Sequence, residues 1–283
     1  MPDAKERART TRIVQSRYNS RVKELRAAFS HPGKGERRLI AIEGELLLAE
    51  ALRSGLSPSV VFVRRGQWDV LERLAALALN RSALDAADIL ELPEDIFASA
   101  VATESPQGIA ALLTPPRFDW DDLFPSHAPA LLLIAAGLQD PGNLGTLIRS
   151  AEAFGATGII TLPGTVHLWN AKVVRASAGS VFRLPVVTCR EEEMIERLNH
   201  QGVTLFAATA EGELPATQAA LTQPCALLIG NEGSGLASHL LRAADARLAI
   251  PTPGPVESLN AAIAGSILLY EAARQRAASQ RKQ

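Results

Sequence analysis

The sequence predicts an α/β fold in two parts, of which the second contains a mostly parallel sheet with helices on both faces. Apolar segments of strand length alternate with segments of helical period throughout the chain after Ala130. A shorter strand–helix–strand pattern occupies the front, and a proline-rich stretch without sustained period separates the two parts. Such alternation is typical of parallel sheets whose crossover helices cover both faces.

The composition indicates a folded chain with room for two domains. The 283 residues are 47% hydrophobic and 21% charged, values that exclude the disordered, collagen-like and coiled-coil classes. The best apolar run, Ala130 to Leu138, has the length of a strand and falls far short of the ~20 residues that span a bilayer. We therefore expect a globular protein without a membrane-spanning segment.

The front part is expected to be a small α/β domain over residues 36–115. It begins after the turn-forming His31-Pro32-Gly33-Lys34-Gly35 segment and ends at Thr114-Pro115-Pro116. Residues 116–129 contain prolines, aromatics and acids without a period, so we expect a linker there. The expected elements are a strand at 39–43, a helix at 44–54, a strand at 60–63, a helix at 70–79 and a strand at 110–113.

The second domain is expected to cover residues 130–277. Its expected strands are at 131–135, 158–162, 205–208, 226–229 and 248–250, and its expected helices are at 144–154, 172–178, 191–199 and 259–270. Ligands of such sheets bind outside the carboxyl ends of the strands. A site is therefore expected in the loops that follow Ala135, Ala208, Ile229 and Ile250.

Positive charge is concentrated at the start of the chain. Residues 1–38 hold eleven Lys or Arg against four Asp or Glu, although the whole chain has a formal charge of −1. Within the basic N-terminal segment, residues 1–35, Arg17, Arg21 and Lys23 lie in a helix-compatible stretch where they can neutralise phosphates. A solvated basic helix face explains the same pattern equally well, so both interpretations stay open.

Neither the N-terminus nor the cysteines favour a secreted or metal-binding protein. Residues 1–12 are charged and lack the hydrophobic region of a secretory signal, so we expect a cytoplasmic protein. Cys189 and Cys225 form no Cys-x-x-Cys pair and have no histidine at ligand spacing. We therefore expect buried reduced thiols, no disulfide and no metal site. The five histidines are scattered, which gives a serine or cysteine triad no local support.

The first loop with unusual chemistry runs from Gln139 to Arg149. Its glycines, Gly142 and Gly145, allow the backbone to approach a ligand, and Asn143 is placed to cap the following helix. Apolar residues of that helix are expected to face the core, which leaves Arg149 off the apolar stripe and able to face the loop. A surface arginine on an ordinary capped helix remains the alternative. The glycine spacing does not match a nicotinamide-binding fingerprint.

The second loop, Gly230-Asn231-Glu232-Gly233-Ser234-Gly235, follows an apolar strand directly. Glycines at this density indicate positive φ angles or a ligand held against the backbone. The lysine of a phosphate-binding P-loop is missing, and Glu232 disfavours an anion. We therefore expect this loop to recognise a cation or a sugar hydroxyl.

The third loop, from Ile250 to Asn260, contains three prolines and then opens an apolar helix. Glu257 and Ser258 are candidates for ordinary capping residues. Asn260 falls in or beside the first helical turn, where its amide can reach both a ligand and a neighbouring loop. We expect the three loops to converge on one pocket at the edge of the sheet.

Three motifs lie in these loops, in order and with suitable separations: Asn143-x-Gly145-x-x-x-Arg149, the loop from Gly230 to Gly235, and Ile250-Pro251 with Glu257-Ser258-Leu259-Asn260. Together they resemble the signature motifs of the SpoU/TrmH family of RNA ribose 2′-O-methyltransferases, over about residues 130–275. Through Ile42-Glu43-Gly44 and Pro106-Gln107-Gly108, the front part is more loosely similar to the small RNA-binding domain that many members carry.

The resemblance implies a parallel sheet whose C-terminal part forms a deep trefoil knot, an exception to the rule that chains avoid knots. It implies S-adenosylmethionine as methyl donor without a metal, RNA as substrate, with ribosomal RNA favoured over transfer RNA, and a homodimer whose interface lies beside the site. The cofactor contacts that it implies are Thr209, Gly230, Ile250 and Leu259. The catalytic residues that it implies are Asn143, Arg149, Glu232, Ser258 and Asn260.

In similar enzymes the arginine at the position of Arg149 is proposed to activate the 2′-hydroxyl. A guanidinium group stays protonated in proteins. We therefore expect Arg149 to stabilise the developing alkoxide and grip an adjacent phosphate, while Glu232 and Asn143 orient it and help to dispose of the proton.

Two other classes compete with this hypothesis. The first is a non-catalytic RNA-binding or ribosome-assembly protein that keeps the knotted fold, which the presence of all five polar groups disfavours. The second is a dinucleotide-binding enzyme, which the glycine spacing disfavours.

Overall fold

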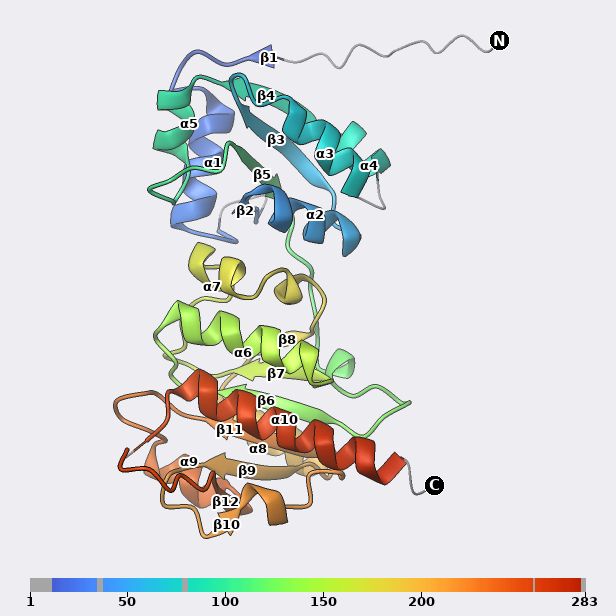
Figure 1. The fold of residues 1–283 in the computed structure, drawn as a ribbon, viewed down its shortest axis with the longest axis vertical. Coiled ribbons are helices and arrows are strands. Elements are labelled where there is room, and N and C mark those ends of the chain that lie inside the picture. Colours follow the sequence, from blue (N-terminus) through green and yellow to red (C-terminus); the bar gives the residue numbers. More distant parts are fainter. Residues whose placement is uncertain (1–11, 35–37, 78–80, 257, 281–283) are drawn as a thin grey trace. The chain divides into compact units, whose positions relative to one another are not determined.

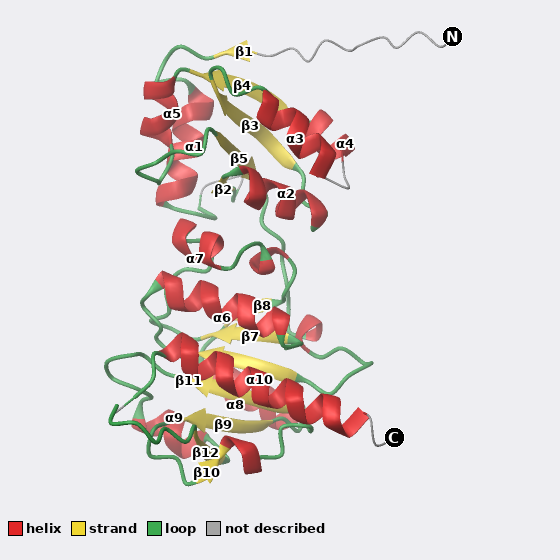
Figure 2. Cartoon of the chain, viewed as in Figure 1, coloured by secondary structure: helices red, strands yellow, loops and turns green. Residues whose placement is uncertain are grey.

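The fold is that of a computed structural model, which describes residues 12–34, 38–77, 81–256 and 258–280. The chain divides into two compact units, Met1–Pro116 and Arg117–Gln283. Each unit is an α/β structure with its own sheet, as the sequence predicts (Figure 1, Figure 2).

The first unit is built on a mixed sheet. Its strands are β1 (Arg12–Ile13), β2 (Ile40–Glu43), β3 (Pro58–Arg64), β4 (Asp88–Leu92) and β5 (Ile109–Leu113). They lie in the order β1-β4-β3-β5-β2, with β5 antiparallel to both of its neighbours. The sequence predicts a simple strand–helix–strand unit here, and the structure corrects this prediction. The wholly apolar β5 is buried along its length and separates β2 from β3.

Helices of the first unit cover this sheet. They are α1 (Ser20–Ser30), α2 (Glu45–Arg53), α3 (Asp69–Leu77), α4 (Arg81–Asp85) and α5 (Glu94–Ala100). Val22 and Leu25 of α1 are fully buried in the same core cluster as Phe97 of α5 and Phe62 of β3. The part of the basic N-terminal segment that the structure describes is therefore integrated into the first unit. β4 and α5 are not among the elements that the sequence predicts.

The second unit is built on a seven-stranded sheet in which every pairing is parallel. The strands are β6 (Leu131–Ala135), β7 (Gly158–Thr161), β8 (Val186–Thr188), β9 (Thr204–Ala208), β10 (Leu214–Pro215), β11 (Cys225–Ile229) and β12 (Ala246–Ala249). They lie in the order β10-β12-β9-β11-β6-β7-β8. The central strands β6 and β11 are buried throughout, which explains their continuous apolar sequences.

Helices flank this sheet on both faces, as the sequence predicts (Figure 1). They are α6 (Pro141–Ala153), α7 (Ala171–Ala176), α8 (Glu191–His200), α9 (Ser238–Ala243) and α10 (Ala261–Gln280). Met194 of α8 and Leu240 of α9 share a core cluster with alternate residues of β6 and β11. The opposite face packs on α10, where a Cβ added to Gly265 would lie 3.4 Å from Ile229 Cγ1. The deep trefoil knot stays a prediction.

Helices α6 and α10 lie side by side and run in the same direction. Asn143 bonds to Asn260 near their first turns, and Ser266 Oγ donates to Ser150 Oγ at 2.7 Å further along. Phe154 and Tyr270 meet edge to face after that. The N-terminal ends of the two helices therefore lie together, and each directs partial positive charge to the same place.

The C-terminal half of α10 is fixed by one arginine side chain. The guanidinium of Arg276 donates to four backbone carbonyls, those of Pro129, Ala130, Leu221 and Gln223. These carbonyls lie just before β6 and β11. The contacts join the end of the helix to the start of the two central strands. Arg276, one of the basic residues near the C-terminal end of this helix, therefore has a structural role.

Residues 117–129, which the sequence predicts to be part of a linker, pack on the second unit. A short 3₁₀ helix covers Asp121–Leu123, and Leu123 is fully buried in the core beside β7. Trp120 Nε1 donates to Glu193 Oε1 of α8 at 2.9 Å. The apolar Leu123 and Trp120 explain why this stretch folds back onto the sheet despite its prolines.

No helix within the described ranges combines the length and the hydropathy that crossing a membrane requires.

Candidate functional site

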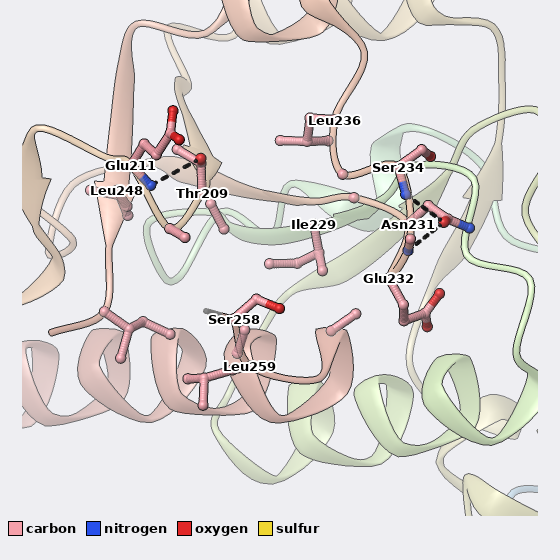
Figure 3. Close-up of a pocket in the computed structure, with 18 of the residues that line it drawn as sticks. Thr209, Glu211, Ile229, Asn231, Glu232, Ser234, Leu236, Leu248, Ser258 and Leu259 are labelled. Atoms are coloured by element: carbon pink, nitrogen blue, oxygen red, sulfur yellow. Dashed lines mark hydrogen bonds between the residues drawn. The ribbon is translucent and has the colours of Figure 1, made fainter. Parts of the chain in front are cut away.

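A pocket of about 450 Å³ opens at the carboxyl ends of β9, β11 and β12 (Figure 3). It is formed by the loops that follow these strands and by the start of α10. Its apolar wall includes Ile229, Leu236, Leu248, Ile250 and Leu259. Its polar groups include Thr209, Glu211, Asn231, Glu232 and Ser258. The second and third loops thus converge on one pocket, as the sequence predicts.

The loop after β11 is held by its own asparagine. Asn231 Oδ1 accepts from the backbone N–H groups of Gly233 and Ser234, at 2.8 and 3.2 Å, and its Nδ2 donates to Gly137 O at 2.9 Å. Two backbone hydrogen bonds join Asn231 to Gly235, whose φ is +65°. Asn231 is not among the predicted site residues, although an asparagine in a glycine-rich turn is a signal for such side-chain bonds.

Gly230 is required by close packing inside this loop. A Cβ placed on Gly230 would lie 2.6 Å from the carbonyl carbon and oxygen of Gly235 and 2.8 Å from Leu236 N. These are backbone atoms, which cannot move aside as the end of a side chain can. Gly230 also lines the pocket, so the glycine sets the course of the backbone that forms the wall.

A hydrogen-bonded chain of three polar side chains starts at Glu232, in the lining of the pocket. Asn143 Nδ2 donates to Glu232 Oε1, and Asn260 Nδ2 donates to Asn143 Oδ1 at 3.1 Å. Figure 3 shows Glu232 at the end of the pocket opposite Thr209 and Leu248. The first loop is not part of the pocket lining, and it reaches the site through Asn143.

Asn143 occupies the first turn of α6, but it does not cap the helix as the sequence predicts. Asp140 is the N-cap, and its Oδ1 accepts from Asn143 N at 2.9 Å, with Pro141 starting the helix. The pKa of Asp140 is lowered mainly by this backbone hydrogen bond and further by the charge of Lys172. Because Asp140 performs the capping, the amide of Asn143 is free to bond to Glu232 and Asn260.

Asn260 reaches a neighbouring loop, as the sequence predicts, and it also caps α10, a role for which the sequence suggests Glu257 or Ser258 instead. Its Oδ1 accepts from Ala262 N and Ile263 N at 2.9 and 3.2 Å, which caps α10, while its Nδ2 reaches Asn143 of the neighbouring loop. Ser258 lines the pocket, and Glu257 lies outside the described residues.

The two glycines of the first loop differ in their surroundings. A Cβ on Gly145 would lie 2.5 Å from Val173 O and from Ala176 Cβ, so Gly145 allows α7 to pack closely on α6. A Cβ on Gly142 would instead meet Asp140 Oδ1. The close approach of a ligand to these glycines stays a prediction.

Arg149 is exposed on α6, away from the buried face formed by Leu144, Leu147 and Ile148. Among the described residues it makes no hydrogen bond or ion pair, and it does not line the pocket. Glu232 and Asn143 bond to each other, and neither bonds to Arg149. The orientation of Arg149 by these two residues stays a prediction.

The three basic residues of the first unit differ in their surroundings. Arg21 pairs with Glu24 at 2.9 Å and with Asp88 at 3.6 Å, so much of its charge is neutralised within the chain. Lys23 lies 5.7 Å from the ring centroid of Tyr18 and is exposed. Arg17 is exposed as well. Lys23 and Arg17 therefore present charge to solvent, whereas Arg21 contributes to the structure of the unit.

The two motifs of the first unit, Ile42-Glu43-Gly44 and Pro106-Gln107-Gly108, meet around the buried carboxylate of Glu43. Glu43 is only 3% exposed, and both of its oxygens accept from Thr103 Oγ1, at 2.9 and 2.8 Å. Its Oε1 also accepts from Gln107 N at 2.9 Å. Glu43 thus holds the 103–108 loop against the end of β2, which explains why a charged residue follows an apolar strand.

The two thiols are buried and free, as the sequence predicts. Burial raises the pKa of Cys189 to about 12, and the nearby Glu193 acts in the same direction. Burial also raises the pKa of Cys225, partly offset by Arg276. Neither thiol has the lowered pKa of a nucleophile.

The fold and the pocket define the class: an α/β protein with room for a cofactor-sized ligand at the carboxyl edge of a parallel sheet. Residues 130–270 match the family model of the SpoU rRNA Methylase family, and residues 19–111 match that of the MRM3-like substrate binding domain. The chain belongs to the SpoU family of RNA methyltransferases.

Relatives and solved structures agree with this membership. The chain is 33% identical over 260 residues to the 23S rRNA (guanosine(2553)-2′-O)-methyltransferase RlmP of Bacillus subtilis, with 91% of this chain and 97% of RlmP covered. It is similar to an AdoMet-bound rRNA methyltransferase from Sinorhizobium meliloti, with a TM-score of 0.79, 30% identity, and 94% and 98% of the two chains covered. AviRb from Streptomyces viridochromogenes in complex with AdoMet gives a TM-score of 0.77 and 26% identity, with 92% and 98% covered.

The predicted family, the enzyme class of S-adenosylmethionine-dependent RNA 2′-O-methyltransferases and the methyl donor are confirmed. The non-catalytic and dinucleotide-binding alternatives have no support. The pocket of this chain also fits such a donor. It offers an apolar wall for a flat base, hydroxyl and carboxylate groups for a ribose or an ammonium, and a volume within the range of small-molecule sites.

Proposed function

We propose that this protein transfers a methyl group from S-adenosylmethionine to a ribose 2′-hydroxyl in structured ribosomal RNA. The observation that carries the proposal is the Glu232–Asn143–Asn260 hydrogen-bond chain at one end of the donor-sized pocket. The relative RlmP is named for 23S ribosomal RNA, which favours ribosomal over transfer RNA. With such a substrate the protein acts in the cytoplasm.

In the donor site we assign Thr209, Gly230, Ile250 and Leu259 as contacts of the methyl donor. All four line the pocket. When bound, the donor supplies its own electrophile, a methyl group on a positively charged sulfur, and no metal is needed to activate it. The protein must hold the acceptor oxygen in line with that methyl group and accept the proton that leaves the hydroxyl.

For the acceptor we assign Asn143, Glu232, Ser258, Asn260 and Arg149. The Glu232 carboxylate, oriented by Asn143, is the acidic group at this end of the pocket and can accept a hydrogen bond from the hydroxyl. Arg149 lies about one and a half turns along α6 from Asn143 and presents a fixed positive charge to solvent. Its role is to stabilise the developing alkoxide and grip a neighbouring phosphate.

The Arg149 role predicts a specific pattern of kinetic loss. Arg149→Ala lowers methyl transfer by about 100-fold or more, because a charged partner of the transition state is removed. Arg149→Lys restores much of the rate if charge alone suffices, and little if the planar fork of the guanidinium is needed. Calorimetric affinity for S-adenosylmethionine stays near the wild-type value in both. Near-normal turnover of Arg149→Ala contradicts the role.

We further propose that the second unit forms a homodimer through α10. Ile263, Ile267 and Tyr270 are large apolar residues spaced by about one turn, with exposed fractions of 53%, 38% and 54%. Such a stripe is typical of a helix that packs against a partner. Its start adjoins Asn260, so a second copy seated there lies beside the acceptor end of the pocket. Ile267→Lys is expected to give monomers in analytical ultracentrifugation.

RNA binding is assigned to the first unit, with Arg17, Arg21 and Lys23 as candidate phosphate contacts. The match to a substrate binding domain over residues 19–111 supports this assignment. Arg17 and Lys23 are exposed, which favours them over the paired Arg21. Arg17→Gln and Lys23→Gln should each reduce the salt dependence of RNA binding, whereas Arg21→Gln should mainly lower stability.

The activity is tested with purified protein, methyl-labelled S-adenosylmethionine and unmodified RNA transcribed in vitro. The expected result is label in ribosomal RNA, recovered after alkaline hydrolysis in a dinucleotide that resists cleavage because its 2′-hydroxyl is blocked. Label confined to transfer RNA would overturn the choice of substrate. Label on a base, or no label in any RNA, would overturn the proposed reaction.

A further inference from the structure

The loop after β7 lies beside the loop that carries Asn143. Strand β7 is the neighbour of β6 in the sheet and runs parallel to it, so both strands end at the same edge. Thr165 Oγ1 donates to Ala135 O at 2.9 Å and accepts from Gly137 N at 3.0 Å, and Val166 N donates to Leu138 O at 2.8 Å. These bonds hold the two loops together.

Gly137 connects this arrangement to the pocket. Its carbonyl accepts from Asn231 Nδ2, and its N–H donates to Thr165. Gly164 approaches it closely, since a Cβ on Gly164 would lie 3.6 Å from Gly137 Cα. The loops after β11, β6 and β7 therefore form a continuous surface along the edge of the sheet.

An aromatic ring and a positive charge lie on the β7 side of this surface. The ring of Trp169 stacks on that of Phe182, with centroids 6.3 Å apart and an interplanar angle of 14°. Phe182 is buried and Trp169 is half-buried, so the indole is supported from within and part of it faces solvent. Lys172 Nζ lies 3.5 Å from Asp140 Oδ2, and its side chain is 58% exposed.

The roles assigned so far leave Trp169 and Lys172 without a function. Neither residue lines the donor pocket. Lys172 lies over the first turn of α6, where a Cβ on Gly142 would be 3.7 Å from Lys172 Cε, next to Asn143. The donor pocket lies at the carboxyl ends of β9, β11 and β12, so an acceptor ribose beside Asn143 has the β7 loop as its neighbour on the other side.

Resting on the proposed function, we propose that this surface binds an unpaired nucleotide adjacent to the methylated ribose. The base stacks on Trp169, and its phosphate contacts Lys172. An aromatic platform with a nearby cation is the chemistry that recognises single-stranded RNA, because every unstacked base offers a flat face and every nucleotide a phosphate. The target ribose is therefore expected in a loop or bulge of the RNA rather than in a regular helix, whose stacked bases cannot reach the ring.

Steady-state kinetics test the stacking contact. Trp169→Ala is expected to raise the KM for ribosomal RNA transcribed in vitro by roughly 5- to 150-fold, the range of losses when one base–aromatic contact is removed. The affinity for S-adenosylmethionine should not change, and Trp169→Phe should stay near wild type because it keeps an aromatic face. Trp120→Ala is the matched control, since Trp120 is also half-buried but packs on α8. An unchanged KM for Trp169→Ala, or an equal rise in Trp120→Ala, overturns the proposal.

Tryptophan fluorescence provides a test that does not require the alanine variant to fold. The chain has three tryptophans, so the variant Trp68→Phe/Trp120→Phe reports on Trp169 alone. Stacking predicts saturable quenching when the same unmodified RNA is added, and Lys172→Gln should shift the titration to higher RNA concentration.

The fluorescence result also separates this proposal from the proposed function. Methyl transfer to ribosomal RNA without any change in Trp169 fluorescence overturns the stacking contact alone. Quenching by RNA in a protein that transfers no methyl group overturns the proposed function and supports the contact.

Discussion

Replacing Gly230 by alanine tests whether the loop after β11 forms the wall of the donor site. The new methyl group would lie 2.6 Å from the backbone of Gly235 and 2.8 Å from Leu236 N. Because all three atoms belong to the backbone, the loop from Asn231 to Leu236 must shift by several tenths of an ångström. Overpacking of this kind costs about 1–3 kcal/mol, and the lower entropy of an unfolded chain with alanine offsets only about 0.4–1 kcal/mol of it.

That strain is expected to appear mainly as lost donor affinity. The two backbone hydrogen bonds between Asn231 and Gly235 are at the surface, so the loop yields before the sheet does. A cost of about 1–2 kcal/mol corresponds to roughly a 5- to 30-fold weaker binding of S-adenosylmethionine. Isothermal titration calorimetry measures this change, and thermal unfolding without ligand shows how much of the strain is global.

Gly233→Ala is the matched control in the same loop. Its new Cβ would meet nothing closer than Asn231 Oδ1 at 3.5 Å, an ordinary contact. Donor affinity should therefore stay within about twofold of wild type. The reasoning is wrong if Gly230→Ala binds the donor as well as the control does, because the pocket wall would then not depend on this close approach.

Three further changes test the scaffold of the site. Asp140→Ala removes the cap of α6 and should cost about 1 kcal/mol of unfolding free energy at neutral pH. Because the backbone hydrogen bond from Asn143 lowers the pKa of Asp140, that difference is present above pH ~4 and should shrink in denaturant titrations as the pH falls below it. Gly145→Ala should destabilise the protein by about 1–2 kcal/mol in urea despite the better helix propensity of alanine, because its Cβ would meet the backbone carbonyl of Val173. Gly265→Ala should cost less, because its Cβ would meet side-chain atoms of Leu147 and Ile229 and no backbone atom; equal effects would refute the packing argument. Arg276→Met should cost about 2–3 kcal/mol, since it leaves four backbone carbonyls without their charged donor, and an unchanged urea midpoint would contradict this role.

Local signals in the sequence are sufficient to predict most strands and helices of the second unit. Leu131–Ala135 is a strand with the predicted bounds, because a continuous apolar run between turn residues is typical of a central parallel strand. The two-residue β10 and three-residue β8 carry too few residues for a period to be recognised. Strand order was not available from local patterns at all, and for this reason the insertion of β5 between β2 and β3 was missed.

The polar residues of the site could be predicted from the sequence, whereas several of their hydrogen bonds and packing contacts could not. The contact of Asn260 with a neighbouring loop is predicted by its place in the first turn, whereas its capping of α10 is not. For Asn143 the capping prediction was wrong, because Asp140 competes for the same N–H groups and precedes Pro141, a preferred first residue of a helix. The role of Gly145 depends on the distance to α7, which no sequence pattern reports.

The most direct test of the account is a crystal structure of the full chain with S-adenosylhomocysteine, the product form of the donor. The account predicts that the ligand lies against Thr209, Gly230, Ile250 and Leu259, with its sulfur at the end of the pocket where Glu232 and Asn143 meet. A ligand bound elsewhere on the protein, or one whose sulfur points away from Glu232, would contradict it.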